Sequence, residues 1–210
     1  MRATNTKTEV RQEQIAQAAL AVIARSGVVG LSVAGVAKEV GVVPSGIYRH
    51  YRSKDEILDV VIDLIAQRLL GNVQAVRMEV SDPLERLHRL LLRHLELIRK
   101  NSGIPRIVLS EEIFSGQPKR RLKVYRMVSN YLKEVAILVQ EAQANGRADA
   151  AVDPDAAAAM FLGLIQPAAI LWMMSDGEFD IDRHAEHAWQ LFGIMLGQPE
   201  NTRTIPPPAG

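Results

Sequence analysis

The sequence of 210 residues contains no cysteine, which excludes disulfides, thiolate metal sites and cysteine nucleophiles. A chain without cysteine suits a reducing compartment. Its first residues also lack the apolar run of a secretory signal, so we expect a cytoplasmic protein. Hydrophobic residues make up 48% of the chain, enough to bury a core, and the length fits one domain or a small domain joined to a larger one.

The sequence also lacks a convincing strand pattern, an internal repeat, a glycine-rich phosphate loop and a serine nucleophile motif. Apolar residues recur instead at three- and four-residue intervals along most of the chain, which predicts an all-α fold. The expected helices run from about Thr8 to Ser26, Val33 to Val40, Pro44 to Tyr51, Lys54 to beyond Leu69, Pro83 to about Ile98, Ile104 to Phe114, Lys119 to Ala144, Pro154 onward, and from a cap at Asp182 to about Leu196. Residues 198–210 form a polar, proline-rich tail that we expect to be disordered.

Basic residues are concentrated near the N-terminus. Residues 1–54 contain eight Lys or Arg and three acidic residues, whereas the remainder contains 17 basic and 21 acidic residues. A basic quarter on an acidic body indicates that one end of the molecule meets a polyanion. Composition alone equally allows a basic face that is only solvated.

Two short helices with a glycine turn between them form a helix-turn-helix pattern in this basic quarter. Gly41 ends the first, and Pro44 begins the second at a first-turn position where its missing N–H costs nothing. A recognition helix of this kind enters the DNA major groove with its N-terminus. Pro44 and Gly46 form a compact end that can approach base edges, and Ser45 can donate or accept hydrogen bonds. The side chains placed to reach phosphates are Ser32, Tyr48, His50 and Lys54, although each alone also fits plain capping or packing.

Residues 10–58 resemble the DNA-binding domain of the tetracycline-repressor (TetR) family of transcriptional regulators. The resemblance rests on an alanine-rich first helix, Ser32 opening the second, Val-Ala-Lys-Glu-Val-Gly at residues 36–41, and Ile-Tyr-x-His-Tyr-x-Ser-Lys-Asp-Glu-Ile-Leu at residues 47–58. It implies phosphate contacts by Ser32, Tyr48, His50 and Lys54, and base contacts near Pro44, Ser45, Gly46 and Arg49. The chain departs from the family at Val43, where relatives often carry Ser or Thr, at Gly35 inside the second helix, and at Gly46, which lacks a side chain to read a base.

The resemblance further implies a three-helix helix-turn-helix domain in residues 1–54 and a larger helical domain for ligand binding and dimerisation in residues 55–197. It implies a homodimer in which the last two long helices pair with their mates, which suits a palindromic operator. The apolar residues that we expect in this interface are Ala157, Phe161, Leu164, Ile165, Ala168, Ala188, Trp189, Phe192 and Met195.

The family layout also implies a repressor that leaves its operator when a small molecule binds. Candidate ligand contacts lie where polar or soft side chains interrupt apolar helix faces: His94, Phe114, Tyr125, Met127, Val128, Tyr131, Met160 and Trp172. An apolar pocket of this composition suits a hydrophobic or aromatic effector, and ordinary core packing is the alternative. No cofactor is expected.

Residues 156–175 carry no formal charge over the length of a membrane span. Small residues, the Gln166-Pro167 pair and acidic flanks argue against insertion, because spans usually carry Lys or Arg at one end. We expect a buried helix that is shared with a partner subunit.

Two other functions remain open at the level of sequence. The protein could bind a small molecule without binding DNA, or it could be a helical enzyme that uses His94 or the pair His184 and His187. The histidine pair has no third metal ligand at a matching spacing. Glu111 and Glu112 are adjacent and point in different directions on a helix, which suits acid–base catalysis poorly. We therefore predict no enzyme, no catalytic site and no metal site.

Overall fold

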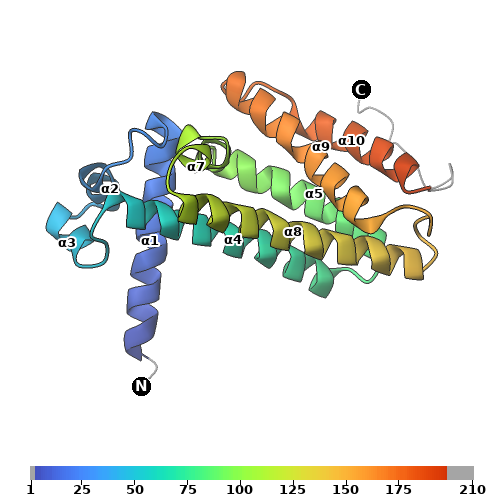
Figure 1. Cartoon of the computed structure of the whole chain (residues 1–210), viewed down its shortest axis with the longest axis horizontal. Coiled ribbons are helices and arrows are strands. Elements are labelled where there is room, and N and C mark those ends of the chain that lie inside the picture. The colour runs from blue at the N-terminus through green and yellow to red at the C-terminus, as the bar shows by residue number, and fades with distance from the viewer. Residues whose placement is uncertain (1–2, 198–210) are drawn as a thin grey trace, which may run out of the picture. The chain divides into compact units, whose positions relative to one another are not determined.

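A computed structural model describes residues 3–197, and side chains from residue 11 onward. The described residues form ten helices and no strand, which confirms the all-α prediction (Figure 1). The helices are α1 (Ala3–Ser26), α2 (Val33–Val40), α3 (Pro44–Tyr48), α4 (Lys54–Glu79), α5 (Pro83–Lys100), α6 (Gly103–Val108), α7 (Glu111–Phe114), α8 (Pro118–Ala144), α9 (Pro154–Met174) and α10 (Ile181–Met195). The tail for which we predict disorder lies outside the described residues.

The chain forms two compact units, and neither is one continuous segment. The first unit contains the described residues up to Leu69 together with residues 97–128, and the second contains residues 70–96 together with the described residues from Ser129. Helices α6 and α7 and the first part of α8 therefore belong to the same unit as the helix-turn-helix. The division at residue 54 stays a functional prediction, because the compact units run across it.

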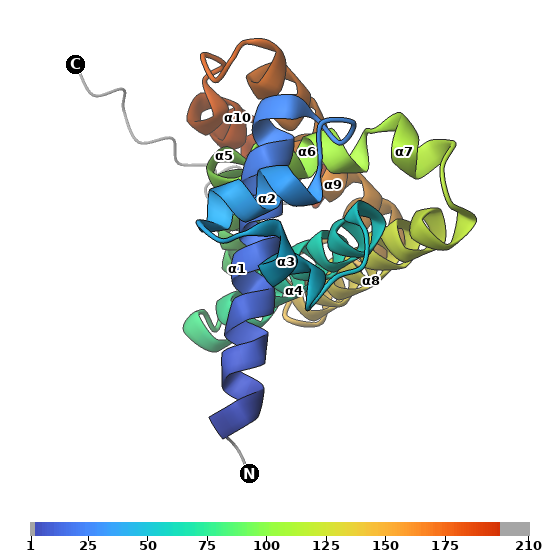
Figure 2. The same ribbon diagram turned by 90° about the vertical axis from the view of Figure 1, so that its left-hand side faces the viewer.

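Local capping explains how the first unit turns from α2 to α3. Ser32 accepts a hydrogen bond from the backbone N–H of Gly35 at 3.1 Å, as its position before α2 predicts. Gly41 ends α2 in the left-handed region at φ 78°, where glycine is favoured because it lacks a Cβ. Helix α2 packs against both α1 and α3 (Figure 2). The predicted helix-turn-helix is present.

Two predicted helix boundaries near the N-terminus of the chain were wrong. Helix α1 begins at Ala3 and not near Thr8, because polar residues can form a helix without the apolar periodicity on which the prediction relied. Helix α3 ends at Tyr48 and not at Tyr51. Beyond it, the backbone N–H groups of His50 and Tyr51 both bond the carbonyl of Ile47, which closes a final turn.

Two boundaries differ further along the chain. The helix predicted from Ile104 to Phe114 is divided into α6 and α7, and Ser110 between them donates its hydroxyl to the Ile107 carbonyl at 2.7 Å. Asp180, not Asp182, caps α10, because its carboxylate accepts from the Arg183 N–H at 2.9 Å. Asp82 and Asp153 likewise accept hydrogen bonds from the first turns of α5 and α9.

Helix α1 rests against α6 at very short range. A Cβ built on Gly103 would lie 2.6 Å from the carbonyl oxygen of Leu20, closer than real Cβ contacts, so glycine is required for this approach. Beside it, Arg68 of α4 donates to Gln17 of α1 at 2.6 Å and to Asn101 at 3.1 Å. Helix α1 is thus attached to α4 and to residues 101–103 at the start of α6.

A buried arginine joins α4, α7 and α8 within the first unit. The Arg120 side chain is 1% exposed, and its guanidinium contacts Asp59 at 2.9 Å, Asp55 at 3.1 Å and Glu112 at 3.1 Å. Burial alone lowers the pKa of Arg120, but hydrogen bonds and negative charge from Asp59 and Asp55 outweigh it and raise the pKa. The Arg120 guanidinium of α8 is therefore a fixed cation that is held beside the start of α4, the helix that follows α3.

The second unit has an aliphatic core closed by aromatic contacts. Helices α9 and α10 lie side by side (Figure 1), and the rings of Phe161 and Phe192 meet edge to face at 5.6 Å between centroids. Trp189 of α10 stacks on His88 of α5 at 4.7 Å. These contacts attach the last two helices to α5 within one chain.

Replacing Arg120 tests how much this ion cluster stabilises the first unit. We expect Arg120→Met to lower the free energy of unfolding by about 2–4 kcal/mol, because three carboxylates lose their shared cation. Arg25→Met is the matched control, since the Arg25–Glu39 pair is exposed and should contribute less than about 1 kcal/mol. Urea unfolding measures both, and equal losses would contradict the assignment.

Candidate nucleic-acid interface

The side chains predicted to contact DNA lie on one exposed part of the first unit. Tyr48 is 55% exposed. Exposed with it are Ser32, Pro44, Ser45, Arg49, His50 and Lys54, while Gly46 is half-buried. Beneath them Ile47 and Tyr51 are buried and anchor the short helix. The arrangement leaves polar and basic groups free for phosphates while the apolar residues hold α3 in place.

A hollow of about 300 Å³ lies between α1 and the α2–α3 turn. Four of the predicted DNA residues, Ser45, Gly46, Arg49 and His50, lie along it. Its remaining lining residues are Arg11, Ile15, Val42, Val43 and Ile47. Arg11 and Val43 thus line the same hollow, although the sequence predicted no DNA contact for either. The signal that could have pointed to Arg11 is its position, as a cation one helical turn before the buried Ile15.

The remaining predicted DNA residues do not line this hollow. Ser32 uses its hydroxyl as the cap of α2, and Lys54 begins α4. Both are exposed at helix starts, where backbone N–H groups and side chains can meet phosphates. The DNA contacts themselves stay predictions for all eight residues.

Two of the predicted ligand residues meet in the second unit. Nδ1 of His94 lies 2.9 Å from the hydroxyl of Tyr131, and their rings are edge to face. Burial lowers the pKa of His94 to about 4 and raises the pKa of Tyr131, so both side chains are neutral at pH 7. His94 and Arg120 are the two buried polar or charged residues of the described side chains apart from tyrosine, and His94 is the one in the second unit.

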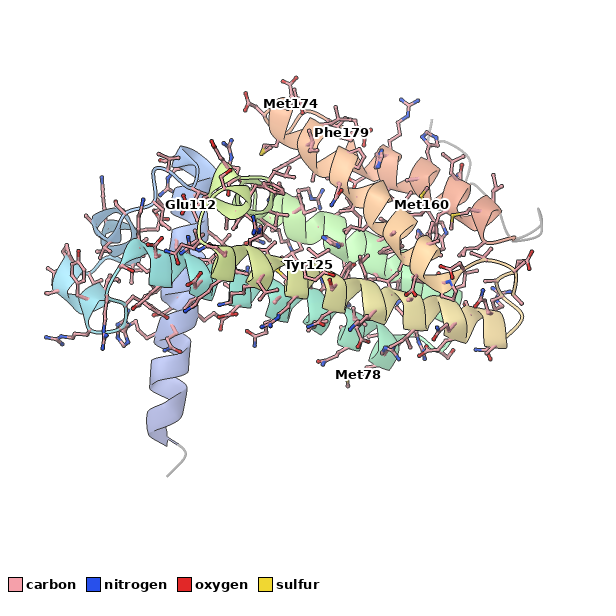
Figure 3. All side chains as sticks on the ribbon, viewed as in Figure 1. Met78, Glu112, Tyr125, Met160, Met174 and Phe179 are labelled. Carbon is pink, nitrogen blue, oxygen red and sulfur yellow. The ribbon has the colours of Figure 1, made fainter. Side chains whose placement is uncertain are left out.

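The other predicted ligand residues are less uniform. Phe114, Tyr125 and Met160 are between 55% and 67% exposed, and Figure 3 shows Tyr125 on α8 and Met160 on α9. Met127 is buried, whereas Val128 and Trp172 are half-buried. Met160 and Trp172 belong to the second unit with His94 and Tyr131, and the remainder belong to the first. Their role in ligand binding stays a prediction.

Most of the residues predicted for the dimer face are covered within their own chain, and the dimer face itself stays a prediction. Six of its nine residues are buried within the single chain: Ala157, Phe161, Ile165, Ala168, Ala188 and Phe192. Leu164, Trp189 and Met195 are half-buried. The six buried side chains pack in the core of their own protomer, so they offer little surface to a second copy. The three half-buried side chains keep surface that a second copy could cover.

The exposed side of the same helices carries a second apolar stripe. Its large members are Met160, Leu171 and Met174 of α9 and Leu191 and Ile194 of α10, each more than 40% exposed. Small exposed residues, Ala156, Ala159 and Gly163, lie near Met160 on α9. Figure 3 shows Met160 and Met174 on α9. A partner helix can approach such a stripe closely.

Helix α9 is also, within the described residues, the one helix whose length and composition would allow a membrane span. The core helix of a soluble protein passes the same test. Only 33% of the apolar window of α9 is buried in the single chain, so the predicted contact with a partner subunit stays a prediction.

The histidines considered for an enzyme do not form a metal site in the described residues. His184 is held by the carbonyl of Leu164 at 2.7 Å from its Nε2, while His187 is exposed. No group of three or more potential metal ligands is found among the described side chains. His184 therefore has a structural partner that links α10 to α9.

An all-helical chain with an exposed basic helix-turn-helix and a separate helical unit defines the class of two-part DNA-binding regulators. Family comparisons place the chain within that class. Residues 15–61 match the model for bacterial regulatory proteins of the tetR family, and residues 80–196 match a tetracyclin repressor-like C-terminal domain. The chain belongs to the TetR family, and it is a homodimeric, DNA-binding transcriptional regulator.

Known proteins resemble the chain over nearly its whole length. Nucleoid occlusion factor SlmA of Photobacterium profundum is 23% identical over 195 residues, which cover 93% of this chain and 100% of SlmA. FadR of Bacillus subtilis, solved with stearoyl-CoA, has a TM-score of 0.73 at 23% identity and covers 86% of this chain and 96% of its own. AibR, solved with isovaleryl coenzyme A and operator DNA, has a TM-score of 0.63 at 21% identity, covering 90% and 100%. At these identities the solved structures show a shared fold.

A charge on the exposed stripe tests whether a second copy covers it. We expect Leu191→Glu to convert the dimer to a folded monomer, because a carboxylate would be buried without a partner between subunits. Met78→Glu is the control, since Met78 of α4 is 89% exposed and lies off the stripe (Figure 3). Analytical ultracentrifugation of both variants at the same concentration measures the mass of the particle. A dimeric Leu191→Glu variant would reject this face.

The buried histidine predicts an acid dependence of stability. Because its folded pKa is about 4 and the ordinary value is 6.5, the unfolded chain binds the proton first as pH falls. Between pH 7 and 4.5 His94 should remove roughly 2.5 kcal/mol of stability. His94→Gln should lose that part of the pH dependence, whereas His187→Gln at an exposed site should keep it. Urea unfolding at the two pH values measures the free energy of unfolding. An identical change of that free energy with pH in all three proteins would refute the effect.

Proposed function

We propose that the protein is a transcriptional repressor, acting in the cytoplasm, whose operator binding is relieved by a hydrophobic small molecule. The observation that carries this proposal is the neutral His94–Tyr131 pair, the buried polar pair in the aliphatic second unit. A second unit built only to dimerise would need no such pair. Acyl-coenzyme A thioesters are the first effector class to test, since FadR and AibR were solved with such molecules.

The chemistry of the pair limits what an effector can present to it. A buried charge would be costly beside two neutral groups, so the part of the ligand that enters should be uncharged. The bond between the Tyr131 hydroxyl and the His94 ring uses one donor and one acceptor, so the pair can offer a ligand one N–H or O–H donor and one acceptor. A carbonyl on a hydrocarbon chain satisfies such a donor, as does the carbonyl of a thioester. The charged remainder of an acyl-coenzyme A would have to stay in solvent.

Helix α8 supplies a route from the effector to the DNA-binding residues. It carries Tyr131 in one unit and Arg120 in the other. Arg120 holds Asp55 in the first turn of α4, and α4 follows α3 directly. A ligand that favours a different setting of α8 therefore favours a different placement of α3. The two settings must differ in ligand affinity for the operator to be released.

Fluorescence anisotropy of labelled duplexes tests the proposal in two stages. An operator is first selected from random duplexes, and its affinity is measured at several salt concentrations. A steep salt dependence is expected. Lys54→Gln should reduce the slope by about two for a dimer, one phosphate per protomer, whereas Lys133→Gln on α8 should not. If the selection yields no preferred sequence, operator binding is rejected.

The second stage adds effectors to the bound operator. Stearoyl-CoA and isovaleryl-CoA are compared with coenzyme A alone and with the free acids. We expect at least one thioester to lower operator affinity about tenfold or more, and Tyr131→Phe to weaken that response while operator affinity without ligand is kept. If every acyl chain fails while the operator still binds tightly, the acyl-thioester proposal is wrong and the regulator remains.

A further inference from the structure

An exposed valine stands immediately before the recognition helix. Val43 is 67% exposed, occupies the N-cap position of α3 and makes no side-chain hydrogen bond there. In the neighbouring α2, the corresponding Ser32 does cap the helix. The two helices of one motif thus begin differently, although both start from extended backbone.

Valine is a poor choice for the stability of the free protein at this position. Ser, Thr, Asn or Asp would satisfy a backbone N–H of a helix only five residues long, and valine satisfies none. Its apolar surface also faces water with little cover. A serine or threonine would remove the first disadvantage and reduce the second. The side chain therefore fits a role that is realised when a partner covers it.

The surroundings of Val43 identify that partner as duplex DNA. It lines the hollow that also contains Arg11, Arg49 and His50, and Ser45 lies beside them. Basic side chains can contact the phosphates of a duplex while an apolar side chain between them contacts an apolar group of a base. Gly46 adds no side chain, and a Cβ built there would meet only Val42, at 3.7 Å. No bulky group of α3 at that position keeps Val43 from a base edge.

One base presents an apolar group in the major groove. Thymine carries its C5 methyl there, whereas the other bases present hydrogen-bond donors and acceptors to a side chain. Valine can exclude water from a methyl group but cannot satisfy a donor or acceptor. We propose that Val43 reads the methyl group of one thymine in each operator half-site. This inference rests on the proposed operator binding.

Replacing thymine by uracil tests the contact, because only the methyl group is removed. Each thymine of the selected operator is changed to deoxyuridine in turn, and the affinity of the dimer is measured. One position per half-site should lower affinity about fourfold, as expected for one buried methyl group, and both half-sites together about fifteenfold. Val43→Ser should bind the thymine and uracil operators equally. Val43→Thr, which keeps one methyl, should retain part of the discrimination.

Val29→Ser is the matched control, because Val29 is 92% exposed on the turn before α2 and is not part of the hollow. It should respond to uracil as the unchanged protein does. If uracil has no effect at any thymine, or if the effect persists in Val43→Ser, the inference is wrong while operator binding stands. If the unchanged protein selects no operator, it is the proposed function that fails. Circular dichroism of each variant confirms that it is folded.

Discussion

The buried guanidinium of Arg120 is the interaction on which the first unit depends most. One cation holds carboxylates from α4 and α7, and it does so at the beginning of the helix that follows α3. A buried charge is tolerated only where partners surround it, so the positions of these helices are tied to one another. Helix α3 itself is too short to hold its own orientation. The placement of the DNA-binding residues therefore comes from tertiary contacts, which include the packing of α3 against α2 and the position of α4 after it.

The two polar elements of the interior have different characters. Arg120 is charged and fixed by three acidic groups, whereas His94 and Tyr131 are neutral and satisfy each other. An ion cluster resists rearrangement because each broken contact leaves a charge unpaired. A neutral pair can exchange one hydrogen bond for another of similar strength. This difference suits a molecule in which one unit must hold a geometry and the other must respond to a ligand.

The sequence predicted the helix-turn-helix well because the signals there are local. Ser32, Gly41 and Pro44 act through hydrogen bonds and backbone angles within a few residues of themselves, and the structure confirms the cap and the left-handed glycine. The dimer face is harder to predict, for the opposite reason. Helices α9 and α10 are apolar on more than one side, so periodicity could not tell which side faces the protomer's own core. Phe161 and Phe192 proved to face each other within one chain.

Residue pattern by itself determined the all-helical class, the position of the recognition helix and the family, since these follow from short-range spacing and a specific motif. Tertiary structure alone decided the partners of distant residues. Arg120 lies in the basic run Lys-Arg-Arg at the start of α8, where sequence indicates a solvated face, yet it is buried. His94 and Tyr131 are 37 positions apart, and Arg11 and Val43 reach the same hollow from separate helices. Such pairings depend on how helices pack, which no local spacing records.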